Sequence, residues 1–167
     1  MSRHIEFTAN FQIPAEAVHR TLVDPGFWNH RVEKGADSGI TLDHLTAGEG
    51  TIDVALAQEL DTSKLPSLVS KVVKGDPSVV RGEVWGPFQD GRAEGSFSAV
   101  TTGLPVKAGG TAVLTDTAEG ASLRIEGEVE VGIKIVGGAV EGMVAELIVN
   151  ILRRDQEVVE EWAAAKA

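Results

Sequence analysis

Hydrophobic and polar positions alternate in several separate stretches of this chain, and this pattern predicts β-strands. The first stretch is residues 4–13, where polar residues separate five apolar ones. Its apolar positions are Ile5, Phe7, Ala9, Phe11 and Ile13. A period of two residues is typical of a strand with one buried face. We therefore expect residues 4–13 to form a half-buried strand.

Two short helices are predicted after this strand. Pro14 suits the first position of a helix, where its missing N–H costs no hydrogen bond. Asp24 is a candidate N-cap for a second helix, which Gly35 can end. Two aromatic residues, Phe27 and Trp28, stand in the first turn of that second helix.

Residues 40–60 and 78–134 return to a period of two and predict about six further strands. Turn signals separate these strands at residues 48–50, 86–91, 103–105 and 119–120. Between the two β regions, residues 62–75 contain apolar side chains at helical spacing, which predicts a short amphipathic helix. That helix is either a mobile lid over the interior or a fixed packing element.

The clearest strand and the longest helix come last. Apolar residues at 123, 125, 129, 131 and 133 alternate with charged ones, which is typical of an antiparallel sheet covered on one side. From Val136 onward, apolar residues form one broad stripe and predict an amphipathic helix of roughly 25 residues, about 38 Å long. The charged residues of this helix, Asp155 among them, are assigned to its other faces.

The predicted order is one strand, two short helices, about six strands and one long helix, in a single domain over residues 1–167. Sequential strands joined by short turns pair as antiparallel neighbours, so we expect an α+β fold with a curved sheet of about seven strands around the long helix. A wide sheet cannot contact one helix along its full width, and we therefore expect a cavity between them. Phe27 and Trp28 would lie at its rim or seal its end.

Three features resemble the START-like, or SRPBCC, superfamily with its helix-grip fold. They are the strand that runs into residues 14–18 (PAEAV), the elbow at residues 24–28 (DPGFW) and the long C-terminal helix. The superfamily includes the birch-pollen allergen, lipid-transfer START domains and bacterial polyketide cyclase/dehydrase-like proteins. The resemblance covers essentially the whole chain and implies an apolar ligand cavity.

Further details are similar to an uncharacterised bacterial family of unknown function. These are residues 65–69 (LPSLV), a strand that ends in Val84 and Trp85, residues 103–106 (GLPV) and residues 136–141 (VGGAVE). The resemblance does not choose among binders, transporters, cyclases and co-chaperones, because one fold hosts many functions.

Composition excludes several kinds of chemistry. The chain has 167 residues with no cysteine and no tyrosine, which excludes disulfides, thiolate nucleophiles and phenolic acids or bases. Its formal net charge is -10, and no cluster of Lys and Arg opposes it, so nucleic-acid binding is not expected. Neither a membrane-spanning run nor a signal peptide is predicted, and we expect a cytoplasmic protein.

The histidines offer one weak catalytic candidate. Four are present, and none is paired at metal-ligand spacing, so no metal site is predicted. No nucleotide-binding loop motif is present either, and no cofactor is predicted. His44 shares parity with Ile40 and Leu42, which would turn it into the cavity as a general acid or base. The alternative is an exposed histidine at a strand end.

Other charged residues fall on strands. The glutamates within residues 126–130 lie opposite an apolar set and are interpreted as a solvated face. Arg81 and Glu83 share parity with Trp85. Either Trp85 faces outward with them, or a bulge before it switches the faces of the strand.

Three hypotheses for function follow. The first is a non-catalytic carrier of a small hydrophobic molecule, such as a lipid, isoprenoid or polyketide. Its predicted ligand-binding residues are Phe27, Trp28, Leu42, Leu56, Trp85, Phe97, Leu114, Ile125, Val129, Met143 and Leu147. The second is a cyclase/dehydrase-type enzyme, which requires a titratable group with a shifted pKa in the cavity. The third is a protein-interaction module with a packed interior.

Overall fold

The computed structural model describes residues 2–64, 67–71, 73–132 and 137–166. The strands in these ranges are β1 (Ser2–Phe11), β2 (Ile40–Gly48), β3 (Thr51–Glu59), β4 (Ser78–Trp85), β5 (Arg92–Thr102), β6 (Val106–Asp116) and β7 (Ala121–Val131). The α-helices are α1 (Ala15–Leu22), α2 (Pro25–Gly35), α3 (Ser67–Ser70) and α4 (Gly137–Lys166). The predicted order of elements is confirmed.

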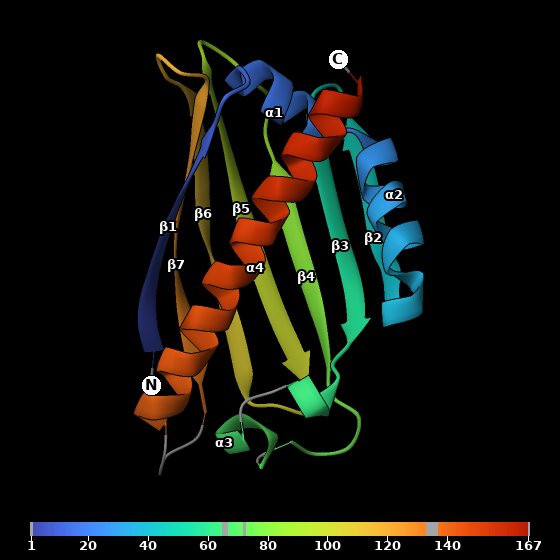
Figure 1. Cartoon of the computed structure of the whole chain (residues 1–167), viewed down its shortest axis with the longest axis vertical. Helices are drawn as coiled ribbons and strands as arrows, with labels where there is room; N and C mark the ends of the chain where they lie inside the picture. Colours follow the sequence, from blue (N-terminus) through green and yellow to red (C-terminus); the bar gives the residue numbers. More distant parts are fainter. Residues whose placement is uncertain (1, 65–66, 72, 133–136, 167) are drawn as a thin grey trace.

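The strands form a single antiparallel sheet in the order β1-β7-β6-β5-β4-β3-β2. From β2 to β7 each strand pairs with its neighbour in sequence, as short connections favour. Strand β1 pairs with β7, at the end of the sheet farthest from β2. Strands β1 and β2 are therefore the two edges of the sheet. Figure 1 shows the sheet curved, with α4 lying across its concave face. This is the α+β helix-grip arrangement predicted from the sequence.

Helix α4 covers the sheet diagonally and is 30 residues long, somewhat longer than expected. It packs against β1, β7 and α1. Its buried residues include Val144, Ala145 and Val159, which recur at helical spacing as the predicted stripe requires. Within the described ranges, no helix, α4 included, combines the length and apolar character that a membrane crossing requires.

Helices α1 and α2 are joined by a tight elbow. Asp24 caps α2, because its Oδ1 accepts a hydrogen bond from the Gly26 N–H at 2.8 Å. The Nε1–H of Trp28 donates to the carbonyl oxygen of Leu22 at 2.7 Å and so satisfies a carbonyl at the end of α1. The ring of Phe27 contacts Trp28 edge-on, with the ring centroids 5.2 Å apart. These two aromatics are buried and pack as part of the core.

The buried core has two parts. The larger part includes Phe11 and Phe27, and it extends from the first strand to the two short helices. The smaller part includes Val129 and Val144, where β7 meets the beginning of α4. Phe97 of β5 is half-buried and packs against both parts.

The predicted amphipathic helix after β3 corresponds to α3, which lies at the end of the sheet opposite α1 (Figure 1). The described helix has four residues. The side chains that suggested its apolar face, Leu65, Leu68, Val69 and Val72, lie outside the described ones. The choice between a lid and a packing helix therefore stays a prediction.

Candidate functional site

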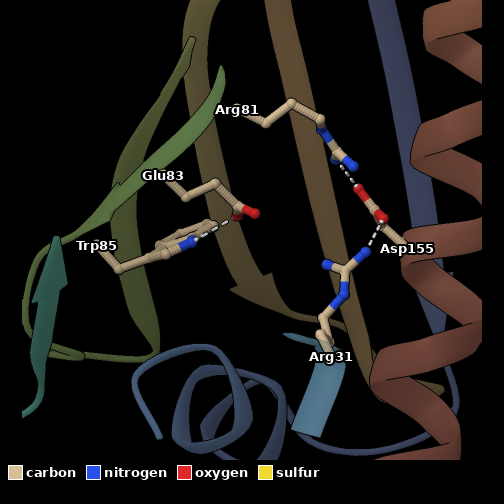
Figure 2. A network of polar contacts seen from close by, with 5 residues as sticks. All are labelled: Arg31, Arg81, Glu83, Trp85 and Asp155. Atoms are coloured by element: carbon tan, nitrogen blue, oxygen red, sulfur yellow. Dashed lines mark hydrogen bonds and ion pairs between the residues drawn. The ribbon is translucent and has the colours of Figure 1, made fainter. Parts of the chain in front are cut away.

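Three charged side chains meet on the concave face of the sheet. Oδ1 of Asp155 in α4 accepts a hydrogen bond from Arg31 of α2 at 2.8 Å, and its Oδ2 accepts one from Arg81 of β4 at 2.5 Å (Figure 2). The exposed fractions of these side chains are 17% for Arg31, 19% for Asp155 and 31% for Arg81. One carboxylate thus ties the long helix to the sheet and to α2.

The aromatic residues at the beginning of α2 help to direct Arg31 toward α4. The guanidinium carbon of Arg31 lies 5.8 Å from the ring centroid of Phe27 and 5.4 Å from that of Trp28. Residues three and four positions apart share one face of a helix, so these rings lie directly beside the arginine. Such cation–π contacts contribute about 0.5–1 kcal/mol at exposed sites and more where water is excluded.

Strand β4 carries Arg81 and Glu83 on its inner face and Val80 and Val84 on its outer face. Trp85 is buried and shares the inner face with Arg81 and Glu83, whereas Val84 is exposed. The pairing of β4 with β3 and β5 runs without a register shift. Both arrangements expected from the sequence are therefore wrong, because Trp85 faces inward and no bulge precedes it.

Glu83 lies next to these three side chains and differs from an ordinary surface glutamate. Its Oε1 accepts a hydrogen bond from the Nε1–H of Trp85 at 3.1 Å, and its other oxygen has no partner within the described part of the chain. Burial, followed by the negative charge of Asp155, raises the pKa of Glu83, although Trp85 and the two arginines act in the opposite direction. Figure 2 shows the carboxyl group of Glu83 directed toward Arg31, Arg81 and Asp155.

We call Arg31, Arg81, Glu83 and Asp155 the polar cluster. Burial opposes the charge of Arg81, but Asp155 and Glu83 raise its pKa above the ordinary value, so it stays protonated. Each arginine donates one hydrogen bond to Asp155 and retains further N–H donors. When Glu83 holds its proton, two cations face one anion, and the cluster is rich in donors.

Apolar side chains surround the polar cluster. Across the sheet, Glu83 lies between Val54 of β3 and Phe97 of β5. On α4, Leu147 and Ile151 lie two turns and one turn before Asp155, so all three share one face of the helix. Leu147 is half-buried and Ile151 is 37% exposed. The apolar surface beside the cluster is therefore only partly covered.

The predicted ligand-binding residues fall into three groups by exposure. Those buried in the core are Phe27, Trp28, Leu56, Trp85, Leu114, Ile125 and Val129. Phe97, Met143 and Leu147 are half-buried, and Leu42 is 40% exposed on the edge strand. The buried group fills the interior, as the packed-interior hypothesis also expects. The assignment of these residues to a ligand site stays a prediction.

A β-bulge in β2 reverses the expected orientation of His44. The pairing with β3 shifts between Leu42 and His44, so that Asp43 is an extra residue in this strand. His44 then pairs with Ala55 on the outer face, where its Nε2 lies 2.7 Å from Asp53 Oδ1. The prediction that His44 points into the cavity is wrong. His44 is exposed, as the alternative expects, but it lies in the middle of β2 and not at a strand end. Hydrogen bonds to Asp53 and then Asp43 raise the pKa of His44.

A shallow groove of about 420 Å³ lies where the β2–β3 hairpin meets the end of β4. Its walls are Thr46, Ala47, Gly48, Thr51, Ile52, Asp53, Val84, Trp85 and Gly86. Trp85 is the one predicted ligand-binding residue in this wall, and no member of the polar cluster belongs to it. The groove is thus a feature distinct from the predicted cavity between the sheet and α4, which stays a prediction.

On the outer face, the pairing of β1 with β7 brings together residues that are far apart in the sequence. The ligand atoms of His4, Glu6 and Glu126 lie within 4.8 Å of one another. Arg124 lies 2.5 Å from a carboxylate oxygen of Glu126 and 3.9 Å from one of Glu6. One arginine therefore already lies beside both carboxylates, which fits the solvated face predicted from the sequence.

The roles of Asp155 and Arg31 were not predicted from the sequence. Asp155 lies seven residues after Ile148 and four before Val159, so its spacing does place it on the buried stripe of α4. Its charge led to the wrong assignment to another face of the helix. No comparable signal marks Arg31, whose partner is 124 residues away in the sequence.

The curved antiparallel sheet, the long C-terminal helix and the two short helices after β1 form the helix-grip fold that START-like domains share. Norcoclaurine synthase from Thalictrum flavum has a TM-score of 0.62 at 14% identity, over 98% of this chain and 87% of that one. TTHA0849 from Thermus thermophilus has a TM-score of 0.59 at 16% identity, over 99% of both chains. At these identities the likeness shows the fold alone.

The chain belongs to the family described as "Protein of unknown function (DUF2505)", whose model matches residues 6–163. Two mycobacterial proteins are similar to it along nearly their whole length. Uncharacterized protein Rv0481c of Mycobacterium tuberculosis and Uncharacterized protein Mb0491c of Mycobacterium bovis are each 29% identical over 169 residues, which is 97% of both chains. The resemblance noted in the sequence is confirmed.

Proposed function

We propose that this domain binds a small, mostly apolar molecule on its concave face, between α4 and strands β3 to β5. The observation that carries the proposal is the incomplete cover of apolar side chains there. Ile151 is 37% exposed, and Phe97 and Leu147 are half-buried beside the polar cluster. A concave apolar surface with a few convergent polar groups is typical of small-molecule sites.

A neighbour of the same fold supports this proposal by analogy. One structure of norcoclaurine synthase from Thalictrum flavum is a complex with dopamine and hydroxybenzaldehyde, so that protein holds small aromatic molecules. Lipids, isoprenoids and polyketides share the apolar body that the concave face of this domain would accept.

Native mass spectrometry of the freshly purified protein, followed by organic extraction, tests the proposal directly. We expect a bound mass that is released as an apolar compound. The stripped protein should also enhance the fluorescence of the uncharged probe N-phenyl-1-naphthylamine, because the probe moves from water into an apolar site.

A pair of variants locates that probe. Ile151→Trp places a large side chain beside the polar cluster and should abolish the fluorescence gain. Val100→Trp makes the same kind of change at an exposed valine on the outer face of β5 and should leave it unchanged. Equal binding by Ile151→Trp and the wild type would contradict the proposed site, and no probe binding by the stripped wild type would contradict the function.

A second candidate is a cyclase/dehydrase-type enzyme acting on the same molecule. Glu83 favours it, because a carboxyl group with a raised pKa inside an apolar site is suited to general acid catalysis. Incubation of any extracted compound with the wild type and with Glu83→Gln tests this role. Conversion by the wild type alone supports an enzyme, and equal behaviour of the two proteins supports a carrier.

A further inference from the structure

We propose that the molecule bound on the concave face is a monocarboxylic amphiphile, whose carboxylate lies beside Arg31 and Arg81 and next to Glu83. This inference rests on the proposed function, because it names the polar end of the same ligand. The apolar body would lie along Leu147 and Ile151 of α4.

The two arginines already bind one carboxylate in this structure. Each oxygen of Asp155 accepts from one guanidinium group, at 2.8 Å from Arg31 and 2.5 Å from Arg81. Each guanidinium group keeps further N–H donors, and it has the planar geometry that suits carboxylates. In Figure 2, the carboxyl group of Glu83 faces these groups from β4. A second carboxylate there would meet N–H donors from two elements.

The net charge of the polar cluster determines when a ligand carboxylate can bind there. With Glu83 ionised, two arginines balance two carboxylates, and an incoming anion would be repelled by Glu83 and Asp155 alike. With Glu83 protonated, the cluster has one uncompensated cation and gains an O–H donor on the carboxyl oxygen that has no partner within the described ranges. The protonated state of Glu83 is therefore the state that binds an anion.

Binding and protonation are then coupled. The charged groups that face Glu83 are Arg81 on its own strand, Asp155 on α4 and Arg31 on α2. Its neighbours on β3 and β5 are the uncharged Val54 and Phe97. A ligand carboxylate adds a negative charge to this set and so raises the pKa of Glu83 further. Binding takes up a proton, and the affinity falls as the pH rises.

The overall charge of the protein cannot produce this preference. A surface with a formal net charge of -10 repels anions over long range. Tighter binding of an acid than of its uncharged ester must therefore come from a local cationic site. The polar cluster contains two arginines on the concave face, and Asp155 compensates one of them.

Displacement of N-phenyl-1-naphthylamine by decanoic acid and by methyl decanoate tests the inference on the full-length protein. The pH is varied from about 5.5 to about 8.5, where the free acid is mostly ionised. The acid should bind at least about tenfold tighter than the ester where Glu83 holds its proton, and it should weaken by up to about tenfold per pH unit once the pH exceeds the pKa of Glu83. The ester should bind equally at each pH.

Three variants assign the effect to residues. Glu83→Gln keeps a neutral donor of the same shape and should make acid binding independent of pH. Arg81→Gln removes one cation and should abolish the preference for the acid. Glu128→Gln makes the same chemical change on the exposed outer face of β7 and should behave as the wild type. If Arg81→Gln does not fold, the pH dependence of acid binding by Glu83→Gln still tests the inference.

Each outcome separates the two proposals. Equal affinity for acid and ester, or no displacement by either compound while the probe still binds, overturns the carboxylate inference and leaves the apolar site intact. A pH dependence that persists in Glu83→Gln also overturns it. Failure of the stripped wild type to bind the probe at all overturns the proposed function itself.

Discussion

Asp155 connects three elements through one carboxylate, because it belongs to α4 and accepts hydrogen bonds from the arginines of α2 and β4. Its replacement by asparagine would keep the shape of the side chain and remove the charge. Two guanidinium groups would then remain half-buried beside a neutral amide, which is the costly outcome for a buried ion pair.

We expect Asp155→Asn to lower the free energy of unfolding by about 2–4 kcal/mol, less than for a fully buried pair because the arginines are partly exposed. Urea titration followed by circular dichroism measures this change. Glu157→Gln, an exposed residue of the same helix, is the control and should change stability by less than about 0.5 kcal/mol. Equal effects of the two substitutions would refute the role of Asp155.

Glu83 makes the stability of the protein depend on pH in an unusual direction for a carboxyl group. Its pKa in the folded protein is raised above the ordinary value of 4.5, because burial and Asp155 disfavour the ionised form. At low pH both the folded and the unfolded chain hold the proton. As the pH rises through the ordinary value, the unfolded chain releases it first, and folding becomes less favourable.

The stability of the wild type relative to Glu83→Gln should therefore fall as the pH rises from about 4 and become constant above the folded pKa. Urea titrations of both proteins across this range measure the difference. A wild type that gains stability relative to the variant with rising pH would show that Glu83 is instead stabilised as an anion.

At the scale of elements, the bulge in β2 decides which side chains of that strand face inward. Leu42 pairs with Leu56 before the bulge, and His44 pairs with Ala55 after it, so Asp43 has no partner residue on β3. Deletion of Asp43 would preserve every one of these pairs. Deletion of Asp53 from β3 would instead turn the buried Ile52 outward.

We expect deletion of Asp43 to cost less than about 1 kcal/mol, since no buried side chain changes face. Deletion of Asp53 should cost at least about 2 kcal/mol, because one large aliphatic side chain loses its burial. Both deletions remove an exposed aspartate that contacts His44, so their difference isolates the register. Similar losses of stability in urea titrations would show that the bulge is not free to close.

Sequence patterns predicted the elements well where each strand has one apolar face. The last strand shows this clearly, since its inner positions Ile125 and Val129 are buried as expected. The pattern failed on β4, where charged side chains lie inside and compensate one another with residues of α2 and α4. Such compensation depends on long-range contacts, as Asp155 shows, and a periodicity cannot reveal it. The bulge at Asp43 is equally invisible, because no residue type demands it.

At the scale of the whole molecule, local stability differs between the β7 end of the sheet and its β2 edge. Strand β7 is hydrogen-bonded on both sides and has buried residues along its whole length. Strand β2 pairs with β3 alone, and its described side chains are half-buried at most. Local opening should therefore begin at the β2 edge.

Hydrogen exchange followed by mass spectrometry should show amides of β6 and β7 exchanging at least about 100-fold more slowly than those of β2. The expected order follows from burial and from the number of neighbouring strands. Equal protection of β2 and β7 would mean that the sheet opens as one unit and that its edges are equivalent.

The hydrogen bond from Trp85 to Glu83 gives this protein an internal optical indicator. Indole emission responds to charge beside its ring nitrogen, and that nitrogen lies 3.1 Å from Glu83 Oε1. The chain has three tryptophans and no tyrosine, so a variant with Trp28→Phe and Trp162→Phe would fluoresce from Trp85 with no competing phenol. Its spectrum would report, without a label, each proton that Glu83 gains and each anion that arrives beside it.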